Sequence, residues 1–543
     1  MVPILFYIGI DENMYYLINW CLLPSSSIPL EISLLINIKN LLFLIVVLFI
    51  RSQVFLFRDL YIEDDPNPIR FKLLVSIFIF SIVRLVLIPN AIFIIFAWDG
   101  LGLSSFLLVS YYARSNRYKS GIVTVLTNRI GDLALLLFII INLGDRLIAS
   151  SLFYSEYSNY WSPILLLIAA ITKSAQLPFS TWLPAAIAAP TPVSALVHSS
   201  TLVTAGVYLL YLFYPTISFC PTSMNILLVL SLMTINIAGL AGIVEIDLKK
   251  VIALSTLSQL GVMIFSLAIG NPDFTFFHLI THAFFKRLIF LAAGVIITHS
   301  NHFQDIRALA GSVRELSVPS SALIISSMAL CGIPFLSGFY RKDLIIEFNL
   351  GNYNNLFGIF IVIFATGITA FYSIRLLFLG ISTPTTRGRL SNKNINNTHL
   401  FLIPLSLIAV LSGCYLAWLL PPVIEIILPL NFKVLTLIVI GLGLIRGIII
   451  NKVKMNSKLR HLFSSLFFIT PFTYYWVKPT TVMVNNINNR LEKGWIIWYP
   501  NGIEKIYSSA VNKIKIFRYN NYLQYFFMGL GLFLFITTLV WFL

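Results

Sequence analysis

The sequence predicts an all-α, polytopic membrane protein, and its composition and hydropathy pattern support this fold class. Of 543 residues, 58% are hydrophobic and only 11% are charged, whereas soluble globular proteins carry about 25% charged residues. Apolar runs, such as 71–96, 226–244 and 251–269, recur along the whole chain between short polar stretches. Since each membrane helix needs about 20 mostly apolar residues, we expect about 14–16 transmembrane helices.

The formal net charge of +16 does not indicate nucleic-acid binding here. The basic residues stand mostly in short loops and near helix ends, where they meet anionic headgroups and set topology. No cleavable signal is expected, because the first apolar run meets Asp11 and Glu12 after ten residues. The cysteines predict neither a disulfide framework nor an iron–sulfur site, since they are far apart and form no CxxC pair: Cys21, Cys220, Cys331 and Cys414.

The chain divides by character into five parts. Ionisable residues interrupt the apolar runs between Asp99 and Asp343, which marks a functional core. The expected parts are N-terminal transmembrane helices (1–90), the core (91–380), additional transmembrane helices (381–480), an amphipathic segment (481–521) and a C-terminal transmembrane anchor (522–543).

The amphipathic segment is too polar to span a membrane. Its apolar residues recur at helical spacing, and Glu504 and Lys505 lie on the opposite face. This pattern predicts a helix along the membrane surface, interrupted at Pro500 and Gly502. Forty helical residues would reach about 60 Å. A simple surface anchor is the alternative.

Ionisable residues within apolar segments are candidate functional residues, because a charge in hydrocarbon costs several kcal/mol. Asp99 follows a long apolar run, and Lys173 stands within another that Pro178 must break or bend. Irregular backbone at membrane depth is tolerated only where it is buried or lines a wet cavity. The alternatives are a headgroup-level acid for Asp99 and snorkelling for Lys173.

The strongest pattern is His278, His282 and Lys286, at i, i+4 and i+8. On a helix these residues form one stripe about 12 Å long, which resembles a proton relay. A zinc or haem site would need further ligands, and no carboxylate or cysteine is suitably spaced nearby. His198 alone is a weaker signal, since a lone histidine is more often a packing residue.

Lys342 and Asp343 follow a segment broken by Pro334 and Gly338. Two interrupted segments, each with a lysine, indicate a repeated half-unit as in secondary transporters. Ordinary loop prolines are the alternative.

Supporting charges stand at the ends of neighbouring segments. Arg129 and Asp132 are spaced i, i+3, and Asp247 precedes Lys249 and Lys250. These residues could equally be interface anchors. Together, lysines and acids suggest a proton switch: a desolvated lysine holds its proton less tightly, and a nearby carboxylate reverses this by stabilising the charged form.

Seven motifs, in order over about 250 residues, resemble the antiporter-like membrane subunits of mitochondrial NADH:ubiquinone oxidoreductase (respiratory complex I). They are Trp98-Asp-Gly-Leu-Gly102, Asn128-Arg-Ile-Gly-Asp132, Lys173-Ser-Ala-Gln176, Pro190-Thr-Pro-Val-Ser-Ala-Leu-Val-His-Ser-Ser-Thr-Leu-Val203, Asp247-Leu-Lys-Lys250, Thr281-His-Ala-Phe-Phe-Lys286 and Gly338-Phe-Tyr-Arg-Lys-Asp343.

The resemblance implies two inverted antiporter-like half-units with broken helices, a lateral amphipathic helix and a closing anchor. It implies proton translocation in the mitochondrial inner membrane, with Asp99 and Lys173 as an acid–lysine switch and Lys342 as the exit-side lysine. The implied central axis comprises Lys249 or Lys250, His198, His278, His282 and Lys286.

The family also implies partners and cofactors. Neighbouring antiporter-like subunits would lie along the lateral helix, and anionic lipids such as cardiolipin would surround the chain. NADH, FMN, iron–sulfur clusters and ubiquinone would belong to other subunits, with none in this chain. A stand-alone sodium/proton antiporter subunit and a purely structural anchor remain alternatives.

The chain departs from the family pattern in several places. Relatives frequently carry glutamate where this chain has Asp99, and a small residue where it has Arg287. Arg341 adds a cation that either opposes the charge of Lys342 or supplies a partner for Asp343. The N-terminus looks shortened.

Overall fold

The computed structural model describes residues 16–23, 30–61, 67–112, 115–143, 161–300, 303–309, 316–351, 356–382, 401–419, 428–450, 457–469, 482–483, 485–489, 504, 507–508 and 528. The chain forms two compact units, Met1–Ile469 and Thr470–Leu543. Most of the predicted amphipathic segment and anchor, including Pro500 and Gly502, lie outside the described residues.

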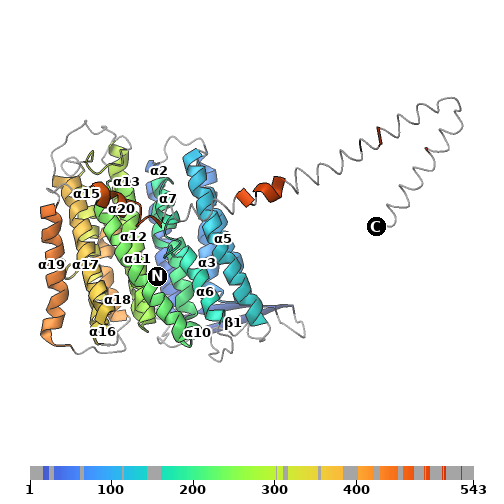
Figure 1. Cartoon of the computed structure of the whole chain (residues 1–543), viewed down its shortest axis with the longest axis horizontal. Helices are drawn as coiled ribbons and strands as arrows, with labels where there is room; N and C mark the ends of the chain where they lie inside the picture. Colours follow the sequence, from blue (N-terminus) through green and yellow to red (C-terminus); the bar gives the residue numbers. More distant parts are fainter. Residues whose placement is uncertain are drawn as a thin grey trace. The chain divides into compact units, whose positions relative to one another are not determined.

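The first unit is a bundle of helices that run side by side (Figure 1). Its first half contains α2 (Ile38–Tyr61), α3 (Pro68–Leu87), α4 (Ala91–Val109), α5 (Ser115–Leu143), α6 (Trp161–Lys173), α7 (Trp182–Ala186), α8 (Thr191–Val193), the π-helix η1 (Ser194–His198), α9 (Leu202–Leu212) and α10 (Tyr214–Ser218). The second half contains α11 (Pro221–Val244), α12 (Leu248–Ala268), α13 (Pro272–His299), α15 (Ser317–Cys331), α16 (Ser337–Gly351), α17 (Leu356–Leu377), the π-helix η2 (Phe378–Ser382), α18 (Leu402–Leu419), α19 (Leu430–Ile450) and α20 (Ser457–Ser464).

The predicted polytopic helical fold is confirmed. Among the described residues, nine helices are long and apolar enough to cross a membrane, and three shorter apolar helices accompany them. The expected run 71–96 is two helices, because α3 ends before Pro89 and α4 begins after it. The total of 14–16 spans concerns the whole chain and stays a prediction.

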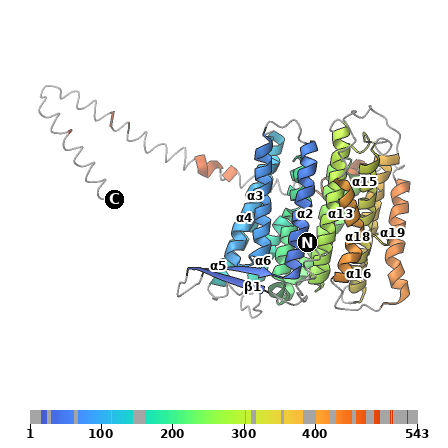
Figure 2. The same cartoon turned by 180° about the vertical axis from the view of Figure 1, so that it is seen from behind.

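The N-terminal region differs from the expected helices. Strands β1 (Tyr16–Leu23) and β2 (Leu30–Ile36) pair in antiparallel fashion at one end of the helices (Figure 2). The first five residues of β2 alternate apolar and polar side chains, which is the period of a strand. Pro24 and Pro29 also disfavour a continuous helix through this region.

Helix α13 is the central helix, and its residues 274–297 are all buried. Helix α2 runs parallel to it: Lys39 at the start of α2 forms an ion pair of 2.5 Å with Asp273. Farther along, the rings of Phe49 and Phe284 lie 6.2 Å apart, and the Phe57 ring packs against Gly294, where a side chain would collide with it. These contacts fix the register between the two helices.

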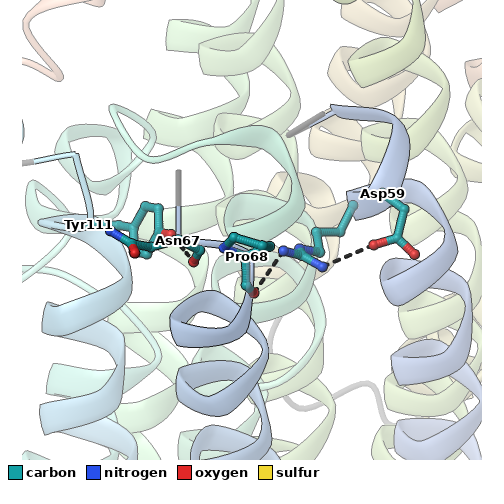
Figure 3. A network of polar contacts seen from close by, with 5 residues as sticks. Asp59, Asn67, Pro68 and Tyr111 are labelled. Carbon is teal, nitrogen blue, oxygen red and sulfur yellow. Dashed lines mark hydrogen bonds and ion pairs between the residues drawn. The ribbon is translucent and has the colours of Figure 1, made fainter. Parts of the chain in front are cut away.

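A polar network ties the turn between α2 and α3 to the end of α4 (Figure 3). The buried Arg58 donates hydrogen bonds to the Asp59 carboxylate at 2.9 Å and to the Pro68 carbonyl at 2.7 Å. The Tyr111 hydroxyl donates to the Asn67 carbonyl at 2.9 Å. Because these bonds satisfy groups where the helices end, they hold the first helices in place against the core.

Candidate functional site

The first polar cluster joins α4 to α6. Asp99 lies midway along α4, so it does not end a helix at headgroup level. Lys173 is the last residue of α6 and is fully buried, which excludes snorkelling. Its ammonium donates a hydrogen bond of 2.6 Å to the Trp98 carbonyl and lies 3.8 Å from the centroid of the Trp98 ring system.

Two acids from different helices accompany this lysine. Asp99 and Asp132 lie 3.7 Å and 3.5 Å from the Arg129 guanidinium. We expect Asp99 and Lys173 to face one another directly or through one water. Lys173 forms no direct ion pair with either acid in the described part of the chain, so the contact through one water stays a prediction. The Asp132 side chain is the more buried of the two acids, 11% exposed against 35% for Asp99. Asp132 therefore belongs to this cluster as fully as Asp99 does.

The backbone is broken after Lys173, as Pro178 predicted. Helix α6 ends there and α7 begins only at Trp182. Side chains hold the break in place: the Trp182 indole N–H donates to the Thr172 carbonyl at 2.9 Å. The Gln176 amide oxygen accepts a hydrogen bond of 2.6 Å from Thr234 of α11. Residues 174–176 of this irregular stretch are buried in protein, a setting in which irregular backbone is tolerated at membrane depth, whereas Pro178 is exposed.

His198 is the last residue of η1, and its side chain is 2% exposed. Its ring lies 6.2 Å from the Trp182 ring, and neither ring nitrogen has a hydrogen-bond partner within the described part of the chain. The π-helix packs against α13. His198 is therefore a buried imidazole beside the central helix.

The stripe on α13 is completely buried, as expected for side chains that face the interior. The rings of His278 and His282 lie 6.2 Å apart. One turn farther, the Lys286 ammonium donates a hydrogen bond of 2.5 Å to the Ser255 hydroxyl of α12. The stripe thus presents two imidazoles and an ammonium in succession, with the ammonium held by a neutral partner.

Helix α16 brings a second lysine to the opposite flank of α13. It begins after a break at Gly332, whose φ of 86° lies in the left-handed region. Lys342 donates to the Leu330 carbonyl and, at 3.3 Å, to the Thr369 hydroxyl. A small cavity connects this lysine to Gln259 of α12, whose amide oxygen and nitrogen are both buried and unpaired.

Arg341 precedes Lys342 and ties α16 to α13. One guanidinium nitrogen donates hydrogen bonds of 2.9 Å to the His278 carbonyl and to the Thr281 hydroxyl. The Asp343 carboxylate instead accepts a hydrogen bond of 2.8 Å from Thr436 of α19. The expectation that Arg341 supplies a partner for Asp343 is therefore wrong.

The two lysines at the head of α12 have different environments. Lys249 is 4% exposed, whereas Lys250 has a half-exposed side chain that forms an ion pair of 3.0 Å with Asp247. Of the two alternatives, the geometry favours Lys249 as the inward-facing residue.

Sequence reasoning missed Ser255 and Gln259, although the signal was present. Both are polar residues one turn apart within the apolar segment of α12, and both face buried lysines. For a metal or cofactor, no group of three or more His, Cys, Asp and Glu side chains converges within the described residues.

Two family models match successive parts of the chain. The model described as "NADH:quinone oxidoreductase/Mrp antiporter, TM" matches residues 89–369. The model described as "NADH dehydrogenase subunit 5 C-terminus" matches residues 372–540.

Curated relatives are similar over nearly their full length. NADH-ubiquinone oxidoreductase chain 5 of Anopheles gambiae is 41% identical and covers 95% of this chain and 90% of its own. The protein of the same name in Lumbricus terrestris is 37% identical, covering 94% and 91%. The one in Rattus norvegicus is 33% identical, covering 95% and 86%.

Two solved structures share the fold. A chain of the Mrp complex from Dietzia sp. DQ12-45-1b aligns with a TM-score of 0.74 at 22% identity, covering 95% of this chain and 59% of its own. A chain of the membrane-bound sulfane sulfur reductase, described as an archaeal respiratory membrane complex, aligns with a TM-score of 0.65 at 19% identity, covering 79% and 88%.

Proposed function

The chain belongs to the NADH-ubiquinone oxidoreductase chain 5 family, and from this premise we propose that its buried polar axis carries protons across the mitochondrial inner membrane. The chain is then a core membrane-arm subunit of respiratory complex I. One observation carries the proposal: ionisable side chains from four elements of the bundle are at most 5% exposed. They are Lys173, His198, His278, His282, Lys286 and Lys342.

Each part of the axis has a role. Asp99 and Asp132 stabilise the charged form of Lys173, and Arg129 holds the two acids in place. Neutralising either carboxylate favours release of the lysine's proton. Protons then pass along a central path formed by Lys249, His198, His278, His282 and Lys286, with Lys342 on the exit side. Lys250 and Asp247 form a surface ion pair outside this path.

The redox chemistry belongs to other subunits. This chain contributes no redox centre, and NADH, FMN, iron–sulfur clusters and ubiquinone bind elsewhere in the complex. Its partners are neighbouring antiporter-like subunits along the C-terminal amphipathic segment. Anionic lipids such as cardiolipin bind at the basic loops. The names of the relatives, which are chains of one oxidoreductase, support this assignment.

The decisive experiment replaces Lys286 by methionine in the intact complex. Inverted membrane vesicles should retain assembled complex and NADH oxidation, but should build a smaller proton gradient per NADH. The matched control is Lys72→Met, which removes an exposed lysine from α3 and should leave the gradient unchanged. An unchanged gradient in Lys286→Met vesicles would overturn the proposal.

The same vesicles test the alternatives. Loss of assembly in the Lys286→Met complex would favour a purely structural subunit. Sodium-dependent transport by the chain would favour an antiporter.

A further inference from the structure

Arg287 of α13 is an unpaired charge in the bundle interior. Its side chain is fully buried, and none of its three guanidinium nitrogens has a hydrogen-bond partner among the residues that the structure describes. A guanidinium stays protonated in proteins, and a buried charge without a partner costs several kcal/mol. The ion pairs among the described residues do not include it. Such a group needs hydrogen-bond acceptors beside it.

The register between α2 and α13 identifies the first acceptor. Phe49 and Phe284 face one another across this interface. Arg287 lies about 4.5 Å beyond Phe284 along α13, and Gln53 lies about 6 Å beyond Phe49 along α2. Arg287 and Gln53 therefore lie at about the same height along the interface between α13 and α2. Gln53 is 7% exposed, and its amide oxygen is buried without a partner.

Helix α18 supplies the second acceptor. The Phe401 ring, which precedes α18, lies 5.7 Å from the Phe57 ring near the end of α2, so α18 runs back along α13. Ser412 stands about 16 Å from Phe401 along α18. This places it beside the turn of α13 that precedes Arg287. Long helical side chains lean toward that preceding turn. The Ser412 hydroxyl is also buried and unpaired.

We propose that Gln53, Arg287 and Ser412 enclose a hydrated site beside the main axis, and that the fixed charge of Arg287 closes this site to protons. Buried polar sites with two to four partners typically hold water. Arg287 is adjacent to Lys286 and about 100° around the helix from it, so such water would offer protons a path off the axis. A fixed arginine charge in a water-filled path excludes protons and other cations.

This proposal rests on the proposed proton translocation but predicts a separate quantity, the passive proton flux without NADH. Intact complex in liposomes is placed under a potassium diffusion potential. Arg287→Met should raise passive flux by at least about tenfold, because it removes the repulsion between a unit charge and a proton in a medium of low dielectric constant. NADH oxidation should persist, while Arg287→Lys, which keeps the charge, should remain close to the parent protein.

A second variant tests the charge while Arg287 stays in place. In Gln53→Glu, a carboxylate level with the guanidinium would cancel its charge, so passive flux should rise as in Arg287→Met. Gln53→Met, which is neutral, should not raise it. Parental flux in Gln53→Glu overturns the proposal, even if Arg287→Met fails to assemble. Failure of the proposed function would instead show as intact NADH-driven pumping in Lys286→Met.

Discussion

The Lys286 ammonium and the Ser255 hydroxyl form a hydrogen bond of 2.5 Å that joins α13 to α12. Ser255 in turn donates its own proton to the Ile252 carbonyl at 2.7 Å. The hydroxyl oxygen is therefore committed as an acceptor for the lysine. The Lys286 ammonium is thus held by an uncharged hydroxyl, which does not stabilise the charged form of the lysine as a carboxylate would.

Ser255→Ala should lower NADH-driven proton pumping about tenfold, because a hydrogen bond to a charged group contributes about 1.5–3 kcal/mol. The variant complex should assemble normally. Ser255→Thr, which keeps the hydroxyl, is the control and should retain most pumping. Pumping at the parental rate in Ser255→Ala would mean that this bond does not hold the lysine in its working position.

Asp132→Asn should reduce pumping more than Asp99→Asn does. Of the two acids, Asp132 has the more buried side chain, 11% exposed against 35% for Asp99, so solvent screens its charge less. Both substitutions keep the side-chain shape. The initial rate of vesicle acidification, normalised to NADH oxidation, measures the difference. The reverse ranking would restore Asp99 as the main partner of the lysine.

Gln259→Leu should separate stability from transport. The substitution removes two buried, unpaired polar atoms, so thermal stability should stay equal or rise. It also removes the polar amide from the wall of the cavity that Gln259 shares with Lys342. Proton pumping should therefore fall. Ile346→Leu, an apolar exchange in the same cavity, serves as the control for packing. A loss of stability with unchanged pumping would contradict this reading of the cavity.

Gly338→Ala should destabilise the junction between α15 and α16. A Cβ atom at this position would lie 1.7 Å from the Ala329 carbonyl oxygen, and backbone must move to relieve that overlap. Such overpacking costs about 1–3 kcal/mol or more, so the yield and thermal midpoint of the assembled complex should fall. Gly441→Ala on α19 is the matched control, because its Cβ would meet nothing within 4 Å.

The sequence predicted the helical membrane fold and the location of the buried groups. Spacing alone placed His278, His282 and Lys286 on one stripe, because helix geometry is local. Prolines likewise predicted the break after Lys173. Which partner each group contacts depends on helices far apart in sequence. Neither the bond of Lys286 to Ser255 nor the contact of Lys173 with the Trp98 carbonyl follows from local spacing.

The N-terminal strands were missed for a different reason. An apolar segment of about 20 residues predicts a span by composition, but it does not report whether the chain turns back within it. The proline pair at Pro24 and Pro29 was the available signal.

The π-helix Ser194–His198 makes the segment around His198 intolerant of a further inserted residue. A π-turn holds one residue more than the α-helical path requires, and hydroxyls accompany the displaced carbonyls: Ser199 and Thr201 donate to Ala195 and Leu196 at 2.5 Å each. Inserting a further residue here would exceed what the π-turn already absorbs and would rotate all that follows by about 100°. The imidazole would then leave the face it shares with α13. A frame-preserving insertion of a single codon is thus a larger change here than most substitutions.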